Sequence, residues 1–307
     1  MPNDDISHNS INKVAVLGGS GFIGSHLVLH LLQPGYSLNI LFNKTRPDLI
    51  SLRGRINIFE GNIDDVESLE KCFEGCDAVY HLVGIIAETR DKSFRKTVEM
   101  GTQNVVVAAK NSGISKIFYL SALGTSENSS SLYFQTKWAA EEAVRNSGLD
   151  YTIFRPSIVY GPEDDFINRI AKMVRYSPLI PVIGDGLYKF QPVYVEELCA
   201  VMALSSQRNF TSRQTYEIGG PERLTYLEIL DIIKNIIGIK KYNIHLPMGL
   251  VKAAVRVLEK ILKPVPITVD QLNMMTAGST CDHAIVEKEF GAKFSSMEMQ
   301  LPDYLRK

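Results

Sequence analysis

The sequence has few cysteines, no long uncharged apolar run and almost no net charge. Four cysteines are spread over 307 residues, and 33 basic residues balance 34 acidic ones. The cysteine spacing fits neither a disulfide framework nor a zinc site, and the balanced charge argues against a nucleic-acid partner. A run of about 18 uncharged apolar residues, which a membrane-spanning helix needs, is absent. We therefore expect a cytoplasmic protein with no transmembrane segment, no nucleic-acid partner and no metal site.

Two segments have an unusual composition: the polar beginning of the chain and an apolar stretch late in the sequence. Residues 1–11 are polar and lack the order of a signal peptide, so we expect a flexible N-terminus there. Between Leu246 and Leu262, apolar residues recur at helical spacing and charged residues interrupt them. We interpret the stretch near 250–262 as an amphipathic helix packed on its own domain. The alternative is peripheral membrane contact through this helix.

Short apolar runs alternate with helical stretches in the first half of the chain. The expected strands are Val14–Leu17, Leu38–Phe42, Ile56–Phe59, Ala78–Val83, Lys116–Leu120 and Tyr151–Phe154. The expected helices are His26–Leu32, Thr102–Lys110 and Tyr133–Val144. Alternation of this kind implies right-handed crossovers and a parallel sheet covered on both faces. The sequence thus predicts an α/β fold with a Rossmann-type, doubly wound parallel sheet.

After Arg155-Pro156 the alternation weakens, and prolines divide the chain into short pieces. We expect a Rossmann domain at 12–165, completed by about 191–218, where Val193–Leu204 and Gln214–Ile218 return to the sheet. Residues 166–190 and 219–307 are expected to form a smaller C-terminal α/β lobe that defines the substrate. Two helical segments, Leu227–Ile237 and Leu250–Leu262, are expected to carry most of its core.

A glycine-rich turn follows the first strand directly. Glycines at 18, 21 and 24 give the spacing GxxGxxG, and the next helix starts within the motif. Such a turn needs positive φ, must let a pyrophosphate approach the backbone, and presents the N–H groups of a helix N-terminus to the phosphates. Because strand, turn, helix and second strand all follow in order, we interpret it as a dinucleotide site rather than a structural turn.

The end of the second strand bears on the choice of nucleotide. Phe42 and Asn43 stand where an enzyme specific for NAD usually has an acid, and Lys44 and Arg46 follow. Cations attract a 2′-phosphate, which an unpaired carboxylate would repel. The sequence therefore favours NADP(H) over NAD(H); the alternative is two solvated loop cations.

Tyr133 and Lys137 form the pattern YxxxK on the helix after the fifth strand. A spacing of four places both side chains on one face of the helix. A nearby ammonium lowers the pKa of a phenol, which is ordinarily about 10, and lets it act as an acid or base near neutral pH. We therefore expect this pair to be catalytic.

Together, several motifs resemble those of the extended and atypical short-chain dehydrogenase/reductases, often labelled NAD-dependent epimerase/dehydratase-like. They are GGSGFIG, HLVG (81–84), GTQN (101–104), YLSALG (119–124), YFQTK (133–137) and RPSIVYGP (155–162). QPVYVEEL (191–198) and ITVDQL (267–272) are most similar to relatives of the 39 kDa accessory subunit of mitochondrial complex I. That subunit holds NADPH tightly without an established turnover, and some relatives are linked to ubiquinone biosynthesis.

The resemblance implies a role for particular residues. It implies that Tyr133 is the acid/base, and that Lys137 bonds the nicotinamide ribose. Asn62 stands where an aspartate usually meets adenine, and its amide can both donate and accept. The full set implied to bind the cofactor is Gly18, Ser20, Gly21, Phe22, Ile23, Gly24, Asn43, Lys44, Arg46, Asn62, Ile63, Leu82, Val83, Gly84, Tyr133, Lys137, Pro156 and Ile158.

Two positions depart from the family pattern. Leu123 replaces the hydroxyl that polarises the substrate of sugar-nucleotide epimerases, which leaves Ser121 as the catalytic candidate, with Thr125. Val98 stands at the offset of the asparagine in the usual catalytic tetrad. The cofactor site is therefore expected to be intact and the proton-transfer apparatus partial.

Three classes of function follow. The first is an NADP(H)-dependent oxidoreductase or isomerase acting on a small carbonyl compound, lipophilic or related to quinones. The second is a non-catalytic NADPH-binding subunit or assembly factor of a respiratory or quinone-synthesising membrane complex. The third is a sugar-nucleotide epimerase or dehydratase, against which Leu123 argues.

Overall fold

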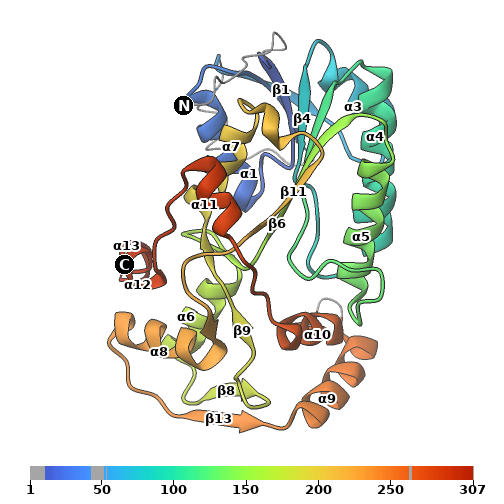
Figure 1. Cartoon of the computed structure of the whole chain (residues 1–307). Helices are drawn as coiled ribbons and strands as arrows, with labels where there is room; N and C mark the ends of the chain where they lie inside the picture. The colour runs from blue at the N-terminus through green and yellow to red at the C-terminus, as the bar shows by residue number, and fades with distance from the viewer. Residues whose placement is uncertain (1–10, 43–51, 53, 263–264, 307) are drawn as a thin grey trace.

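One parallel β-sheet forms the centre of the fold. The computed structural model describes residues 11–42, 52, 54–262 and 265–306. The main sheet has seven strands in the order β11-β6-β5-β4-β1-β2-β3, and all neighbouring pairs are parallel (Figure 1). These strands are β1 (Lys13–Leu17), β2 (Ser37–Phe42), β3 (Ile56–Glu60), β4 (Ala78–His81), β5 (Lys116–Leu120), β6 (Asp150–Pro156) and β11 (Gln214–Ile218). The order confirms the expected Rossmann-type α/β fold.

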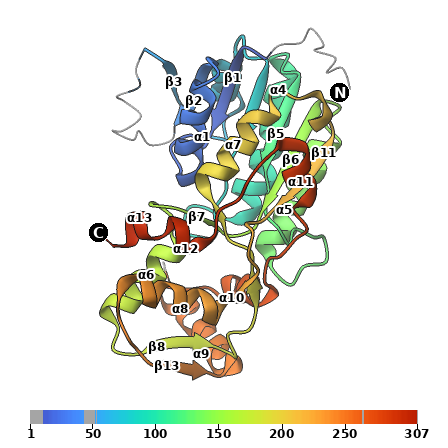
Figure 2. The ribbon, with the colours of Figure 1, turned by 60° about the vertical axis from the view of Figure 1, so that its left-hand side comes forward.

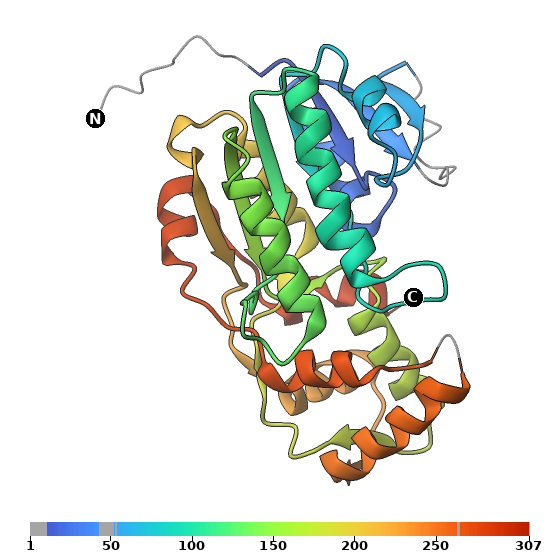
Figure 3. The ribbon, with the colours of Figure 1, turned by 90° about the vertical axis from the view of Figure 1, so that its right-hand side faces the viewer.

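Helices cover both faces of this sheet because its strands are apolar on both sides. Along β1, Val14 and Val16 belong to one core, whereas Ala15 and Leu17 belong to the other. Over the first core lie α1 (Phe22–Leu32), α7 (Val195–Ser205) and α11 (Ala284–Phe290), seen in Figure 2. Over the second lie α3 (Val66–Phe73), α4 (Gly101–Asn111) and α5 (Leu132–Arg145), of which α4 and α5 face the viewer in Figure 3.

Several elements differ from the sequence-based expectation. Helix α1 begins at Phe22, four residues before the expected start, because the glycine turn passes directly into the helix. Strand β4 ends at His81 instead of Val83, which frees Leu82–Gly84 for a loop. A π-helical turn, η1 (Arg95–Met100), precedes α4, and a short 3₁₀ turn, η2 (Asn209–Thr211), precedes β11. Neither η1 nor α3 was anticipated.

The remaining elements form a smaller lobe beyond the carboxyl ends of the sheet strands. Its helices are α6 (Phe166–Tyr176), α8 (Tyr226–Ile237), α9 (Met248–Ile261), α10 (Val269–Ala277), α12 (Met297–Gln300) and α13 (Pro302–Leu305). Three two-stranded pairs accompany them, namely β7 (Val159–Tyr160) with β10 (Val193–Tyr194), β8 (Ile180–Ile183) with β13 (Asn243–Leu246), and β9 (Lys189–Phe190) with β12 (Leu224–Thr225). The division of the chain into domains at 165, 190 and 218 stays a prediction.

The core of this lobe corrects one expectation. Helix α8 buries Ile229, Leu230 and Ile233, as predicted. Helix α9 contributes little core, since Val255 is its one buried residue. The amphipathic helix near 250–262 is therefore present and one of its sides packs on its own lobe, with Val255 buried and Val251 lining a pocket, but its most apolar stripe is exposed and adds nothing to the core. None of the helices within the described ranges is long and apolar enough to span a bilayer.

Some predictions concern residues outside the described part of the chain. They are the flexible N-terminus, except for its last residue, and the nucleotide-selecting residues Asn43, Lys44 and Arg46.

Candidate active site

The glycine turn joins β1 to α1 at the carboxyl edge of the sheet. Gly18 has a φ of +83°, so the positive φ lies there, whereas Gly21 has a φ of −80°. The positive φ that the sequence predicts for this turn is therefore present, and it belongs to the first glycine of the motif. A Cβ added at Gly24 would lie 2.1 Å from the Gly18 carbonyl oxygen, so only glycine lets the helix pack this close. Gly21 is the N-cap and has no side chain, which leaves the first N–H groups of α1 for a phosphate.

A second segment, Leu82–Gly84, runs beside this turn. The Leu82 N–H donates to the Leu17 carbonyl at 3.0 Å. A Cβ at Gly18 would come within 3.2 Å of the backbone of Leu82 and Val83, so the two segments touch. A Cβ at Gly84 would lie 3.4 Å from the Lys137 ammonium nitrogen. The segment thus leads directly from the phosphate turn to the YxxxK pair, as the binding of one dinucleotide requires. We call the turn Gly18–Gly24 and the segment Leu82–Gly84 together the cradle.

Other cofactor candidates are distributed around this cradle. Asn62 is exposed just beyond the end of β3, and the carbonyl of the buried Ile63 accepts a hydrogen bond from Asn104 at 3.1 Å. Phe22 and Ile23 are the first two residues of α1, and Ser20 lies within the turn. Pro156, the last residue of β6, and Ile158, two residues later, line a pocket.

Tyr133, Lys137 and Glu141 occupy one face of α5, four residues apart, and all three are buried. The Lys137 ammonium donates to the Leu120 carbonyl at 2.7 Å. Burial lowers the pKa of Lys137 to about 8, while the Glu141 carboxylate opposes that shift. Glu141 is held in turn by Arg155, whose guanidinium donates to both carboxylate oxygens at 2.9 and 2.7 Å.

The pKa of Tyr133 does not follow the sequence-based expectation. Burial raises it to about 12, instead of the lysine lowering it. The ring lies against Phe94 and Phe134 in a small apolar cluster that excludes water. In this state the phenol is protonated at neutral pH, and it can donate a proton more readily than it can remove one.

Three positions considered for proton transfer do not line the pocket. They are the hydroxyl residues Ser121 and Thr125, and Val98 at the place of the tetrad asparagine. Ser121 lies 3.3 Å from Thr125, oxygen to oxygen, on the buried side of the loop. The pocket is lined instead by Ala122 and Leu123. Val98 is fully buried in the core, where its carbonyl accepts a hydrogen bond from Thr102 at 2.6 Å. The hydroxyl proposed at Ser121 is therefore not among the groups that line the pocket.

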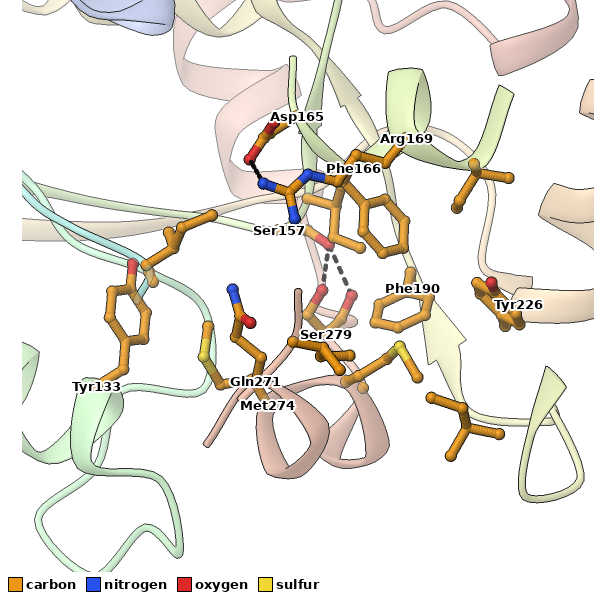
Figure 4. Close-up of a pocket in the computed structure, with 18 of the residues that line it drawn as sticks. Tyr133, Ser157, Asp165, Phe166, Arg169, Phe190, Tyr226, Gln271, Met274 and Ser279 are labelled. Atoms are coloured by element: carbon orange, nitrogen blue, oxygen red, sulfur yellow. Dashed lines mark hydrogen bonds and ion pairs between the residues drawn. The ribbon is translucent and has the colours of Figure 1, made fainter. Parts of the chain in front are cut away.

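The pocket has a volume of about 580 Å³ and extends from Tyr133 into the smaller lobe (Figure 4). Apolar side chains from α6, β8, β9, α9 and α10 make most of its wall, among them Phe166, Met173, Phe190 and Met274. Its polar groups are few. Asp165 and Arg169 form an ion pair at 2.8 Å, Ser157 and Ser279 share a hydrogen bond, and Gln271 contributes an amide (Figure 4). Such a lining suits an apolar ligand with one or two polar groups.

Helix α10 is the part of the site that the sequence analysis missed. Asp270 accepts hydrogen bonds from the Leu132 N–H at 2.7 Å, the Tyr133 N–H at 3.3 Å and the Ser131 hydroxyl at 2.8 Å. Met274, one turn later, packs in the cluster of Tyr133. The capping box formed by Thr268 and Gln271 is visible in the motif ITVDQL and indicates that a helix starts there. Nothing in the motif indicates which helix Asp270 meets.

Within the described part of the chain, no three His, Cys, Asp or Glu side chains are placed to hold a metal ion.

Comparisons with known proteins agree with this geometry. The model of the NAD dependent epimerase/dehydratase family matches residues 14–219. The mitochondrial NADH dehydrogenase (ubiquinone) 1 alpha subcomplex subunit 9 of Arabidopsis thaliana is 31% identical over 276 residues, which cover 85% of this chain and 69% of that protein. A ceramide reductase of Caulobacter vibrioides is 25% identical, over 76% of this chain and 73% of that protein. Among solved structures, UDP-glucose 4-epimerase of Thermotoga maritima has a TM-score of 0.75 and 22% identity, over 96% of this chain and 98% of that one. This last likeness concerns the fold.

Proposed function

The chain belongs to the NAD dependent epimerase/dehydratase family, and on that premise we propose that it is an NADP(H)-dependent oxidoreductase acting on a lipophilic carbonyl compound. The observation that carries this proposal is the apolar pocket of about 580 Å³ with Tyr133 in its wall. A sugar nucleotide would bring two phosphates into a wall in which, among the described residues, Arg169 is the one cation and is already paired with Asp165. One relative is a ceramide reductase, and ceramide is a lipid, which agrees with an apolar substrate.

The residues present fit a dinucleotide. In this proposal the turn Gly18–Gly24 and the N-terminus of α1 hold the pyrophosphate, and Leu82–Gly84 supports the adjoining ribose. Lys137, beside Gly84, donates to the nicotinamide ribose, and Pro156 and Ile158 cover the nicotinamide ring. When bound, the reduced nicotinamide would supply a hydride to the carbonyl carbon.

Tyr133 completes the reaction in this proposal. As the carbonyl carbon gains a hydride, its oxygen becomes an alkoxide and takes the phenolic proton of Tyr133. The phenolate left behind is stabilised by the Lys137 ammonium on the same face of α5. Because burial keeps Tyr133 protonated, the arrangement favours reduction of the carbonyl.

The preference for NADP(H) is part of the proposal. It rests on Lys44 and Arg46, the two cations that follow β2 in the sequence. Charge-assisted hydrogen bonds from such cations to a 2′-phosphate are stronger than neutral ones.

A second candidate is a nucleotide-holding subunit or assembly factor of a membrane complex. Leu123 in the pocket wall and the buried Val98 remove two polar groups from the usual proton-transfer apparatus. The Arabidopsis relative is a subunit of NADH dehydrogenase by name. In that case the cradle would be used and the pocket would hold no reacting substrate.

A single-turnover assay separates the two candidates. The protein is loaded with NADPH and mixed with lipophilic ketones, aldehydes or quinones, and the absorbance of the reduced nicotinamide is followed. We expect oxidation in the wild type, loss of at least a hundredfold in rate for Tyr133→Phe, and unchanged NADPH affinity, since the phenol acts on the carbonyl oxygen. Lys137→Ala should lower both the rate and the affinity. Equal rates in wild type and Tyr133→Phe would refute the catalytic assignment.

A further inference from the structure

Helix α9 exposes an apolar stripe to solvent. The stripe consists of Leu250, Ala253, Ala254, Val257, Leu258 and Ile261, which recur at spacings of three and four. The exposed fraction is 70% for Leu250, 57% for Val257 and 72% for Ile261. A core-packed helix hides such a stripe, and a helix exposed on a water-soluble surface lacks it. Helix α9 lies at the outer end of the smaller lobe in two different views (Figures 1 and 3).

The exposed charges on the outer side of α9 are positive. Arg256 and Lys260, four residues apart, are exposed along one flank of the stripe. Lys252 lies on the inner side, where it is half-buried and donates to the Asn273 side-chain oxygen at 2.8 Å. The one acid of the helix, Glu259, is engaged on the other side, where it accepts the Val269 N–H at 2.9 Å. The outer surface of α9 therefore combines an apolar stripe with two exposed cations and no acid, as helices that lie in an anionic lipid surface do.

The inner side of the same helix belongs to the pocket. Val251, next to Leu250 in the sequence, lines the pocket, and so does Leu246 at the end of β13. One turn of α9 thus contacts the pocket with one side and solvent with the other.

We propose that the α9 stripe is a membrane-docking surface, in which the helix lies in the headgroup region of an anionic bilayer. Arg256 and Lys260 meet the lipid phosphates, and the stripe enters the acyl boundary. The docked orientation places the α9 side of the pocket at the bilayer. If the protein reduces a lipophilic carbonyl compound, as proposed above, this substrate enters the pocket from the membrane.

Vesicle flotation tests the docking. The full-length protein is mixed with vesicles of phosphatidylcholine alone, or with added phosphatidylglycerol. We expect binding to the anionic vesicles, weakened at least tenfold by Leu250→Gln with Ile261→Gln, since each side chain loses its transfer into the acyl boundary. Arg256→Glu with Lys260→Glu should remove the preference for the anionic lipid. The matched control is Ile285→Gln with Met299→Gln, two residues exposed by 60% and 69% on α11 and α12, and it should bind like the wild type.

The remaining outcomes overturn the proposal. Wild-type protein that floats with neither vesicle refutes it, as does a stripe variant that binds as tightly as the control. A dimer that the stripe variant converts to monomer, without vesicle binding, assigns the stripe to a second copy instead. Turnover of a water-soluble short-chain ketone is a separate readout. Turnover without flotation refutes the docking alone, and flotation without any turnover refutes the proposed function alone.

Discussion

Burial shifts the pKa values of Tyr133 and Lys137, the YxxxK pair, in opposite directions. It disfavours the charged form of each, so it raises the pKa of Tyr133 to about 12 and lowers that of Lys137 to about 8. The phenol remains a proton donor over the physiological range, whereas the lysine approaches neutrality just above it. The lysine is therefore the group whose titration should be visible in the rate.

We expect the rate of carbonyl reduction to fall as the pH rises through about 8. The charged form of Lys137 is needed to stabilise the phenolate, and the folded-state pKa is lowered, so this charge is present below about pH 8 and lost above it. Single-turnover rates across the pH range check this expectation. Lys137→Arg, which stays charged, should shift the fall upward. A fall centred near the ordinary lysine value of about 10.4 would mean that burial does not govern this group.

Substitutions of two glycines in the phosphate turn should have different effects, one on nucleotide binding and the other on the free energy of unfolding. Gly21 has an extended backbone, and an added Cβ would be 3.3 Å from the Gly18 carbonyl oxygen, so Gly21→Val should fold while its side chain blocks the pyrophosphate. Gly24→Ala places its Cβ 2.1 Å from that oxygen, and backbone cannot give way cheaply. We expect Gly24→Ala to lower the free energy of unfolding by about 3 kcal/mol. Urea denaturation and NADPH titration of both variants provide the measurement. If Gly21→Val binds NADPH normally, the nucleotide lies elsewhere.

Lys44 and Arg46 should control the choice of nucleotide. Replacing both by Ala is expected to weaken NADPH binding by about 2 kcal/mol and to leave NADH nearly unchanged, because only NADPH carries the 2′-phosphate. Fluorescence titrations with both nucleotides are sufficient. A wild type that prefers NADH would contradict the assignment.

At the scale of elements, α10 connects the smaller lobe to the catalytic helix. The N-terminus of α5 takes its cap from Asp270, a residue 137 positions later than Tyr133. Asn273, also on α10, donates to the Ser130 carbonyl at 3.3 Å. Gln271 and Met274 on the same helix line the pocket, so α10 contacts both the substrate pocket and the start of α5.

Removing this cap should affect both stability and turnover. Asp270→Ala is expected to lower the free energy of unfolding by about 1–2 kcal/mol and to reduce kcat about tenfold, with NADPH affinity unchanged. Asp270→Asn keeps a hydrogen-bond acceptor, so its free energy of unfolding and its kcat should both fall less than those of Asp270→Ala. Thermal denaturation and steady-state kinetics of the pair decide the matter. If Asp270→Ala lowers stability and leaves kcat intact, the contact is structural only.

At the scale of the whole molecule, the site lies where the two lobes meet, beyond the carboxyl ends of the sheet strands. The cradle uses the loops after β1 and β4, and the pocket uses the loops after β5 and β6 together with the smaller lobe. Crevices at this edge of a doubly wound sheet are where ligands bind in general. The nucleotide contacts therefore depend on the sheet, and the substrate contacts on how α6, α9 and α10 pack against each other.

The sequence alone determined the elements that local patterns specify. The apolar runs of β1, β2 and β5, the glycine turn and the YxxxK pair predicted a Rossmann sheet, because strand periodicity, turn glycines and helical spacing are properties of short segments. From those segments the catalytic pair and the phosphate turn could be proposed by residue number.

Only the tertiary structure decided properties that depend on distant neighbours. The raised pKa of Tyr133 results from packing against Phe94 and Phe134, and its helix is capped by Asp270 from the other lobe. The amphipathic pattern of α9 predicted a helix, but it is the same whether the stripe faces a core or solvent. Burial is a relation between segments far apart in the chain, and the packing of the smaller lobe left this stripe outside.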